Sequence, residues 1–527
     1  MSFGHFQMSD LPHDEQVVPT EPQSAETPEI DSRVTIHVTT DEHLVNDQAA
    51  DALGGVDNLY VRGHQLVRII PGTPINGRPT APLISPVGPE LREMLCQQIK
   101  FIAKERRTGE SYSIHPPHWC VDGVANRKHW PKVKPLTGLV TCPVMRSDGS
   151  ILCKPGYDPQ SQLYLSYSDQ PIALPHVLTQ QDAMDAANML LDLVHDFPFA
   201  SDADKASFLA CALTPFARPA FSGPVPMFVI DANMAGTGKS MLADIAGTLA
   251  SGEAIPRMVL PRGDDEMRKQ ITSIVIRGDS ITLIDNVATT VNYPSLDAAL
   301  TSTTWKDRLL GSSKAISLPI TTVWIMTGNN VAVAGDTIRR VCRCRLESYV
   351  ENPQDRETFK IPFLMQHLNN NLPKYQKAIL TILGAYDSAG RPPMPMRPWG
   401  SFEGWSNLVR GAVIFAGLPD PADTIDDLRE DSTGSNLPIR ELIRLWTKFD
   451  QSGRGITAAQ MLVNAQSDSE LRDVLCELCG HSPEKLPTAG SLGSKLARFK
   501  GCVVGQQRLE SRKVSGTQFW SILNLRS

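Results

Sequence analysis

The chain lacks the long apolar runs and the cysteine pattern that mark membrane and secreted proteins. No apolar run reaches the roughly 20 residues that a membrane-spanning helix needs, and no signal peptide opens the sequence. The 10 cysteines have none of the spacing that stapled extracellular domains use. We therefore expect a cytoplasmic protein without a membrane partner.

The chain also lacks the overall positive charge of proteins that coat nucleic acid. Its formal net charge is −6 over 527 residues, which argues against a uniformly basic surface. Positive charge gathers near the C-terminus, where residues 484–527 hold eight Lys and Arg against two Glu. Such a patch suits a phosphate backbone, although a solvated charged face fits the same composition. Lys495 and Arg498, on a basic helix expected over 492–499, are the candidate contacts there.

The most informative segment is Phe228–Ser240, which reads Phe-Val-Ile-Asp-Ala-Asn-Met-Ala-Gly-Thr-Gly-Lys-Ser. A hydrophobic strand, a loop of small residues and Lys-Ser at a helix start form the layout of a nucleoside-triphosphate-binding P-loop. Lys239 is expected on the β- and γ-phosphates, and the Ser240 hydroxyl on Mg²⁺. The predicted nucleotide-binding residues are Asn233, Met234, Ala235, Gly236, Thr237, Gly238, Lys239, Ser240 and Met241.

Asn233 departs from the usual pattern, which has Gly at the first loop position. Asn tolerates a left-handed backbone better than other non-Gly residues, so we expect the loop to close. The alternative interpretation is a glycine-containing turn that binds nothing.

Composition and hydrophobic patterning divide the whole chain into five expected parts. Residues 1–33, acidic and rich in Pro, Ser and Gln, predict a disordered arm, and residues 34–175 predict a β-rich accessory domain. Within it, Gly63-His64-Gln65 and Ser147-Asp148-Gly149 predict hairpin turns, and residues 89–106 have helical apolar spacing. Strands and helices alternate over 176–355, residues 356–480 are mostly helical, and 481–527 have the outline of a winged helix. The predicted fold class is α/β, with a P-loop NTPase core around a parallel sheet.

A second strand, Ile281-Thr-Leu-Ile-Asp285-Asn286, ends in a carboxylate that suits Mg²⁺. Asn286 stands where many ATPases carry a glutamate that activates water. An amide takes up no proton, so Asn286 could only orient the water. Glu266 is a candidate base from elsewhere, and a solvated loop carboxylate is the simpler interpretation of it.

A third strand, Thr321–Met326, is followed by Thr-Gly-Asn329-Asn330. A strand-end Asn329 can position water beside the γ-phosphate. Arg340, with Arg339 as a weaker candidate, follows in Asp336-Thr-Ile-Arg-Arg and suits a finger on the γ-phosphate of a neighbouring subunit. Pairing of these arginines with local acids is the alternative.

A hairpin is expected between these strands, over residues 305–319, with a polar tip. Such a mobile basic hairpin could grip a nucleic-acid backbone without sequence preference, or it could be a plain surface hairpin. Its candidate contacts are Lys306, Arg308 and Lys314.

Together, Asn-Met-Ala-Gly-Thr-Gly-Lys-Ser, Ile-Thr-Leu-Ile-Asp-Asn, Thr-Gly-Asn-Asn and Asp-Thr-Ile-Arg-Arg resemble the motifs of AAA+-related superfamily-three helicases. The resemblance is to the poxvirus-type primase-helicase branch of phages, plasmids and integrated elements, and it covers about residues 180–350. It implies ATP and Mg²⁺ as cofactors, single-stranded or forked DNA as partner, a hexameric homo-oligomer, and the cytoplasm of a bacterial host or phage-infected cell.

The same resemblance places Lys239 and Ser240 on phosphate and magnesium, and Asp285 on magnesium. It makes Asn329 a sensor, Arg340 a finger acting in trans and Lys314 a DNA contact. Residues 34–175 show no close pair of acids of the kind a polymerising primase uses, so a separate primase is an expected partner.

Three functions fit these patterns. The first is a replicative ATP-dependent DNA helicase of a mobile element or phage, which hydrolyses ATP between ring subunits and moves along single-stranded DNA. The second is an ATP-switched initiator or loader that binds duplex DNA without unwinding it, which the amide at Asn286 favours. The third, a small-molecule phosphotransferase, is disfavoured by the sensor and finger pattern.

Overall fold

The computed structural model describes residues 31–70, 83–86, 88–166, 172–175, 177–308, 315–349, 353–425, 437–450, 454–481, 485–500, 503–504, 507–514 and 516–524. The acidic arm expected over 1–33 lies outside the described residues except at 31–33. The chain divides into two compact units. The first comprises residues up to Asp57 with Val87–Val133, and the second comprises Asn58–Pro86 with Lys134–Ser527.

The first unit combines a small mixed sheet with three helices. Strand β1 (Val34–His37) runs parallel to β5 (Ile99–Lys104), which pairs antiparallel with β6 (Ser111–Ile114). The helices are α1 (Glu42–Ala52), α2 (Gly88–Gln98) and α3 (His118–Asn126), and the 3-10 turn η1 (Leu53–Gly55) follows α1. The single helix expected over 89–106 was wrong in its second half. There Ile99 and Phe101 are buried at every second position, which is the period of a strand.

The second unit contains the remaining accessory strands, so this division differs from one accessory domain over 34–175. The hairpins expected at Gly63-His64 and at Ser147–Gly149 are confirmed. Gly63 and His64 have φ of +56° and +63°, as a type I′ hairpin turn requires. The strands are β2 (Leu59–Arg62), β3 (Gln65–Ile69), β4 (Leu83–Ile84), β7 (Lys134–Pro135), β8 (Gly138–Val140), β9 (Val144–Met145), β10 (Ile151–Leu152), β11 (Gly156–Asp158) and β12 (Leu163–Leu165).

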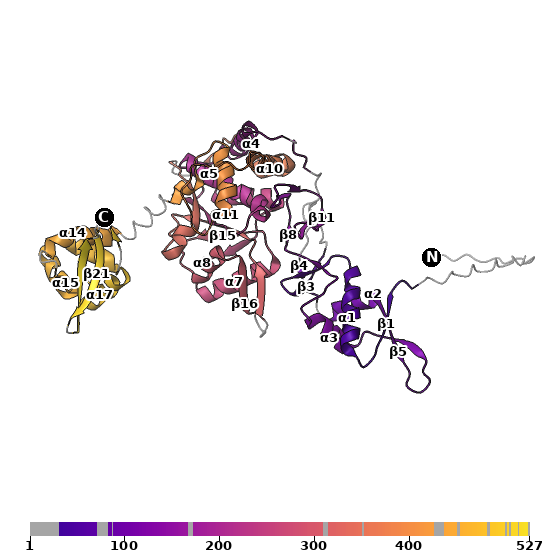
Figure 1. Cartoon of the computed structure of the whole chain (residues 1–527). Coiled ribbons are helices and arrows are strands. Elements are labelled where there is room, and N and C mark those ends of the chain that lie inside the picture. Colours follow the sequence, from indigo (N-terminus) through magenta and orange to yellow (C-terminus); the bar gives the residue numbers. More distant parts are fainter. Residues whose placement is uncertain are drawn as a thin grey trace, which may run out of the picture. The chain divides into compact units, whose positions relative to one another are not determined.

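A five-stranded parallel sheet forms the centre of the second unit, which confirms the expected mixed α/β class (Figure 1). The strand order is β14 (Arg257–Val259), β15 (Ile281–Val287), β18 (Val323–Asn329), β13 (Met227–Ala232) and β19 (Val341–Leu346). Every residue of β13 is buried, as expected for a strand covered on both faces.

Alternate β13 side chains enter two different cores. Phe228 and Ile230 join a cluster that includes α5 (Asp202–Ala217) and α6 (Lys239–Ser251), whereas Val229 joins one with α7 (Asp264–Arg277) and α8 (Pro294–Thr301). Between α8 and β18, β16 (Thr304–Arg308) and β17 (Ala315–Pro319) form the expected hairpin, whose tip lies outside the described residues. Helices therefore cover both faces of the sheet, and the ends of its strands are where a ligand could bind.

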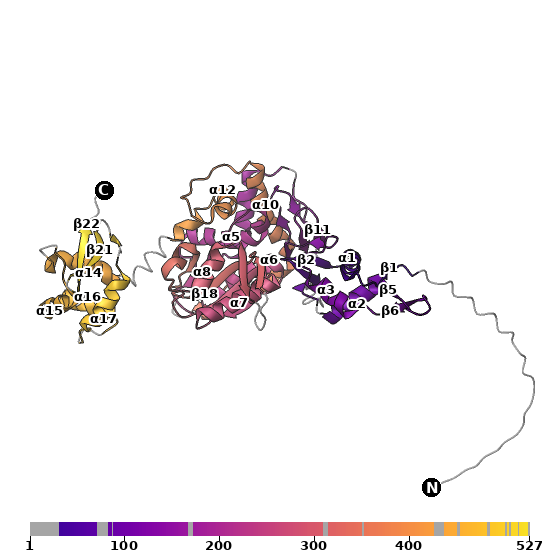
Figure 2. The ribbon, with the colours of Figure 1, turned by 60° about the horizontal axis from the view of Figure 1, so that its bottom comes forward.

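The helical region expected over 356–480 is split between two cores. Its first part packs with α4 (Gln180–Leu193) and α5 in the larger core cluster, and α5, α10 and α12 lie side by side in Figure 2. Its elements are η4 (Pro353–Asp355), α9 (Leu364–Asn370), α10 (Leu372–Ser388), α11 (Glu403–Trp405), the π-helical η5 (Ser406–Arg410), α12 (Gly411–Phe415) and η6 (Pro421–Asp423).

The C-terminal part, residues 437–524, has a hydrophobic core of its own around Trp446, Leu475 and Trp520. Helices precede an antiparallel sheet in which β21 pairs with both β20 and β22. The elements are α14 (Leu437–Phe449), α15 (Ala458–Ser467), α16 (Ser469–Cys479), α17 (Ala489–Arg498), β20 (Val503–Val504), β21 (Gln507–Val514) and β22 (Thr517–Asn524). None of the helices in the described ranges is long and apolar enough to cross a bilayer.

Candidate functional site

Three predicted site residues meet at the carboxyl edge of the parallel sheet. Ser240 follows the loop after β13, Asp285 lies near the end of β15, and Asn329 ends β18. Parallel strands present their carboxyl ends at one edge, which is where open α/β sheets bind ligands. Strand β18 lies between β13 and β15, so the sheet brings together residues that are far apart in the sequence.

Two glycines set the shape of the loop between β13 and α6. Gly236 and Gly238 have φ of +79° and +93°, a conformation that favours glycine. A Cβ at Gly236 would lie 2.5 Å from Gln354 Oε1, and one at Gly238 would lie 2.8 Å from Phe197 Cε1. The loop is therefore held close to both residues, and neither glycine position has room for a side chain.

Lys239 folds back over this loop. Its Nζ donates to Met234 O at 3.1 Å and to Thr237 Oγ1 at 3.3 Å. Burial lowers the pKa of Lys239, and the nearby carboxylates of Asp231 and Asp285 oppose that shift. The ammonium thus spans the loop, while Ala235, Gly236 and Met241 are exposed at its rim and at the start of α6.

Asn233 closes the loop by a different means from the one expected. Its backbone is not among the positive-φ residues, so the expected left-handed conformation was wrong. Instead its side chain pairs in both directions with Ser348, just beyond β19. Asn233 Nδ2 donates to Ser348 O at 2.8 Å, and Ser348 N donates to Asn233 Oδ1 at 3.1 Å. Glycine could make neither bond.

Asp285 accepts hydrogen bonds from three elements. Ser240 Oγ donates to its Oδ1 at 3.1 Å, Thr327 Oγ1 donates to the same oxygen at 2.5 Å, and Arg257 Nη1 donates to Oδ2 at 2.6 Å. Burial raises the pKa of Asp285, but the hydrogen bonds from Thr327, Arg257 and Ser240 outweigh it and lower the pKa below its ordinary value. Arg257 also reaches Asp244 at 2.5 Å and so bridges two carboxylates.

Asn286 occupies a β-bulge. Ile284 pairs with Met326 and Val287 pairs with Gly328, so Asp285 and Asn286 together oppose the single residue Thr327. Asn286 has φ of +55°, and its backbone amide donates to Thr327 Oγ1 at 3.1 Å. This position therefore requires a residue that tolerates the left-handed conformation, which gives Asn286 a backbone role apart from any catalytic one.

Asn329 is exposed at the end of β18, and its neighbour Asn330 ties the strand end to the loop. Asn330 has φ of +47°. Its backbone amide donates to Ala232 O at 2.9 Å, and its side-chain oxygen accepts from Arg345 Nη2 at 3.0 Å. Arg345 in turn forms an ion pair with the buried Asp231 of β13.

The sequence interpretation missed Asp231, Arg257, Thr327 and Arg345. The sequence did hold one signal for them. Asp231 is a charged residue inside the otherwise apolar β13, and a buried charge requires a partner.

The two adjacent arginines of η3 (Gly335–Arg340) differ in accessibility. Arg340 is 13% exposed and pairs with Asp297 at 2.8 Å, whereas the Arg339 side chain is 62% exposed and pairs with Asp336 at 2.9 Å. The Arg339 carbonyl also accepts from Trp399 Nε1 at 2.7 Å. Arg339 therefore presents its guanidinium to solvent, and Arg340 anchors η3 on α8.

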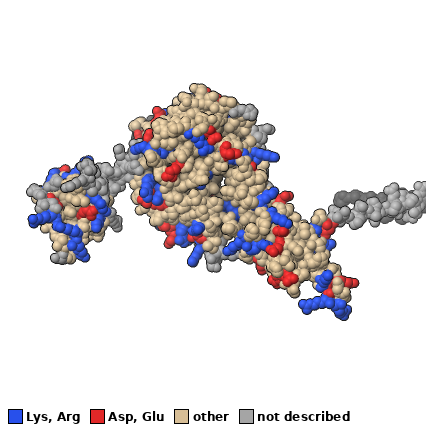
Figure 3. Space-filling model, in the orientation of Figure 1, with Lys and Arg blue, Asp and Glu red and all other residues tan. Residues whose placement is uncertain are grey.

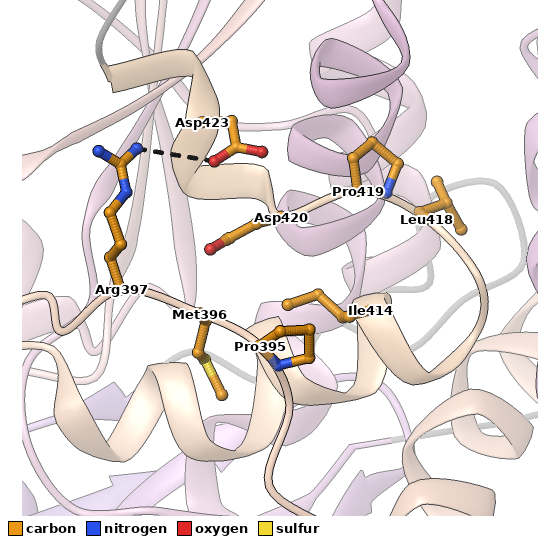
Figure 4. A pocket seen from close by; sticks show the side chains of 8 residues that line it. All are labelled: Pro395, Met396, Arg397, Ile414, Leu418, Pro419, Asp420 and Asp423. Atoms are coloured by element: carbon orange, nitrogen blue, oxygen red, sulfur yellow. Dashed lines mark ion pairs between the residues drawn. The ribbon is translucent and has the colours of Figure 1, made fainter.

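The segment that follows α10 lines a cavity of about 450 Å³ together with the ends of α12 and η6 (Figure 4). Its charged groups are already paired. Asp420 binds Arg410 through two hydrogen bonds of 2.9 and 2.5 Å, and Arg397 forms an ion pair with Asp423 at 3.7 Å. The pair of Arg397 with Asp423 connects the segment that carries Trp399 to η6.

The predicted nucleic-acid contacts are only partly described. Lys306 and Arg308 are exposed on β16, on the face opposite the buried Trp305. Lys314 lies outside the described residues, and so does the Arg498 side chain, whereas Lys495 on α17 is half-buried. Arg512 and Lys513 on β21 are exposed, and Figure 3 shows several basic side chains on one face of the C-terminal part.

The residues at the carboxyl edge fit a magnesium nucleotide. A hydroxyl and a carboxylate that already share a hydrogen bond are a donor pair that Mg²⁺ accepts while it keeps several waters. The glycine-shaped loop and Lys239 supply amides and an ammonium for phosphate oxygens. Among the described residues, no three His, Cys, Asp or Glu side chains gather as a metal site of their own.

Comparison with known proteins gives remote structural neighbours. No family model and no curated protein matches the chain. The NrS-1 C-terminal region is 11% identical at a TM-score of 0.38, covering 82% of this chain and 98% of its own. A JCV helicase structure is 13% identical at a TM-score of 0.21, covering 49% of this chain and 74% of its own. Because both TM-scores are below 0.5, the function proposed below rests on the residues of this chain.

Proposed function

We propose that this protein is an ATP-dependent DNA helicase that works as a ring. The proposal rests on one observation. Ser240 Oγ donates a hydrogen bond to Asp285 Oδ1 at 3.1 Å, beside a glycine-shaped loop that the Lys239 side chain spans. This arrangement supports a P-loop ATPase of the AAA+-related superfamily-three type, in the primase-helicase branch that the sequence resembles.

Each residue at the sheet edge has a role in this proposal. The amides of residues 236–240 and the Lys239 ammonium would hold the triphosphate, and Ser240 and Asp285 would hold magnesium, which neutralises phosphate charge when bound. Thr327 and Arg257 keep Asp285 ionised and oriented. Asn329, exposed at the strand end, would position water.

The ring rests on a finger supplied in trans, and Arg339 is the more accessible candidate. Large apolar side chains are exposed at Val259, the last residue of β14, and at Tyr349, beyond the end of β19; they are 77% and 93% exposed and suit contact with another subunit. The exposed Lys306 and Arg308 would contact single-stranded or forked DNA, with Lys314, Lys495 and Arg498 as further contacts. A hexamer and a separate primase belong to the same proposal.

The direct test is strand separation. Purified full-length protein with ATP and Mg²⁺ should separate a forked DNA duplex that carries a fluorophore and a quencher, and Lys239→Ala should not. Lys205→Ala, which changes an exposed lysine on α5, is the control and should unwind normally. Failure of the wild type to separate any fork would overturn the proposal.

A second function, an ATP-switched initiator or loader, is favoured by one observation. The bulge places an amide side chain after Asp285 where a carboxylate base would stand, and slow hydrolysis suits a switch. The helices and sheet of residues 437–524 would then bind duplex DNA as a winged helix. Tight, sequence-specific binding of duplex DNA with ATP, without strand separation, would favour this second function.

A further inference from the structure

A second cavity lies at the other end of the parallel sheet. It measures about 390 Å³, and its lining includes Ser280, directly before β15, and Thr321, two residues before β18. The cavity therefore lies at the amino ends of strands whose carboxyl ends carry Asp285 and Asn329. A seven-residue strand spans roughly 20 Å, so a ligand here would be well separated from Lys239.

Most of the lining is apolar, and it comes from three parts of the second unit. Leu163 belongs to the accessory strand β12, Pro215 and Phe221 lie at and beyond the end of α5, and Ile320 follows β17. Thr303 and Pro319, at the base of the β16–β17 hairpin, complete one side. Predominantly apolar walls with a few polar groups are typical of small-molecule sites of this size.

Arg218 is the charged residue of this lining, and its charge is not neutralised by the described part of the chain. Its Nη2 donates to Ile320 O at 2.9 Å and its Nη1 to Phe221 O at 3.5 Å. The guanidinium also lies 5.3 Å from the centre of the Phe221 ring. The buried Nε has no hydrogen-bond partner, and none of the described carboxylates forms an ion pair with Arg218.

A cation held this way favours an anion. Burial lowers the pKa of Arg218 to about 10, because its surroundings disfavour the charged form and no carboxylate compensates. A carboxylate or phosphate in the cavity would give the guanidinium the charged acceptor that it lacks, and Arg binds such groups well. The cavity of about 450 Å³ beside η6 offers no such unpaired charge at Asp420, because Asp420 already forms an ion pair with Arg410.

We propose that the Arg218 cavity binds a small molecule that joins an apolar body to one carboxylate or phosphate group. Phe221, Leu163 and Ile320 would contact the body, and Arg218 the anion. Such a ligand would touch the base of the β16–β17 hairpin without competing for the Lys239 loop.

Calorimetric titration of the full chain tests this proposal with three probes of one shape. Naphthalene-1-acetate and 1-naphthyl phosphate carry the anion, and neutral naphthalene-1-acetamide does not. We expect saturable binding of at least one anion, and at least about tenfold weaker binding of the amide, as loss of a charge-assisted hydrogen bond predicts. A preference for one anion would identify the source as a carboxylate or a phosphate.

Two variants remove different parts of the site. Arg218→Met keeps an unbranched apolar stem and removes the charge, and should weaken binding of the anion at least about tenfold while leaving binding of the amide unchanged. Gly138→Val fills the cavity from β8 and keeps Arg218, and should weaken all three probes. It guards against misfolding of Arg218→Met, because a Cβ at Gly138 meets only Leu163 Cδ2, at 3.8 Å.

Two controls locate the binding. Arg106→Met, an exposed arginine of the first unit, and Lys239→Ala should both bind like the wild type. The Lys239→Ala result is independent of the proposed helicase function, so the two proposals fail separately. Absence of saturable anion binding, or equal binding of anion and amide to the wild type, would overturn the assignment.

Discussion

Ser240 Oγ lies 3.1 Å from Asp285 Oδ1, although 45 residues separate them in the sequence. The contact exists because β13 and β15 run parallel and end at the same edge, with β18 between them. The second donor to Asp285 Oδ1, Thr327, comes from that intervening strand. The sheet places Asp285, and the glycine-shaped loop and the start of α6 place Ser240 against it.

Thr327→Val should weaken ATP hydrolysis without unfolding the protein. The substitution keeps the shape and removes the 2.5 Å hydrogen bond to Asp285, so the pKa of Asp285 should rise. We expect a loss of about 10- to 100-fold, the scale for groups that orient a metal ligand. The acid limb of the pH–rate profile should also move to higher pH, which a purely structural defect would not produce.

The control is Thr322→Val. Thr322 is equally buried, directly before the amino end of β18, where it donates to Asp279 O at 2.7 Å. Equal losses of hydrolysis in the two variants would contradict a specific role for Thr327.

Asn286→Gly should retain hydrolysis within a few-fold, whereas Asn286→Val should destabilise the protein by about 1–2 kcal/mol, the cost of a left-handed residue with a branched side chain. The reason is the φ of +55° in the bulge, which glycine adopts freely. Chemical denaturation gives the stability and a phosphate-release assay gives the rate. A 100-fold loss of hydrolysis in a folded Asn286→Gly would show that the amide itself orients water.

Arg339→Ala and Arg340→Ala should have different effects. Arg340 is 13% exposed and bound to Asp297, so its loss should lower the free energy of unfolding by about 1–3 kcal/mol. Arg339 is mostly exposed, so Arg339→Ala should leave stability unchanged and lower hydrolysis by the assembled protein on the order of 10³-fold. Mixing Arg339→Ala with Lys239→Ala should restore part of the activity, because each supplies what the other lacks.

The reverse outcome would reassign the finger. If folded Arg340→Ala lost hydrolysis and Arg339→Ala kept it, Arg340 would have to leave Asp297 and act across the interface.

Asp158→Asn should make stability less dependent on pH in the acid range. The hydrogen bond from Arg146 is the largest cause that lowers the pKa of Asp158 from 3.8 to about 2. A carboxylate whose pKa is lower in the folded than in the unfolded protein stabilises the fold at pH values above the unfolded-state pKa. This stabilisation is lost as the pH falls through the folded-state pKa. The free energy of unfolding of the wild type should therefore exceed that of Asp158→Asn by about 2 kcal/mol at pH 6, and this difference should vanish toward pH 2.

Urea titrations at several pH values measure this difference. Asp202→Asn, an exposed carboxylate on α5, is the control and should show little change. A difference between wild type and Asp158→Asn that stayed constant from pH 6 to pH 2 would contradict the assignment.

The sequence predicted the parallel sheet and the meeting of Lys239, Ser240 and Asp285, because apolar strands and the glycine loop carry their own local signals. It did not predict how the loop closes. The pairing of Asn233 with Ser348 joins residues 115 positions apart in the sequence, just beyond the ends of the neighbouring strands β13 and β19, and no local pattern encodes it. Likewise, Asn286 has the appearance of a substituted base in the sequence, whereas the register shift opposite Thr327 shows a backbone requirement.

The most direct test of the central claim is ATP hydrolysis by wild type, Lys239→Ala and the control Lys205→Ala, each with and without single-stranded DNA. In a nucleic-acid motor, DNA should stimulate hydrolysis by the wild type and the control, and Lys239→Ala should lose about 10²–10³-fold or more of the activity. Hydrolysis that DNA leaves unchanged, or that survives Lys239→Ala, would contradict a nucleic-acid motor built on this loop.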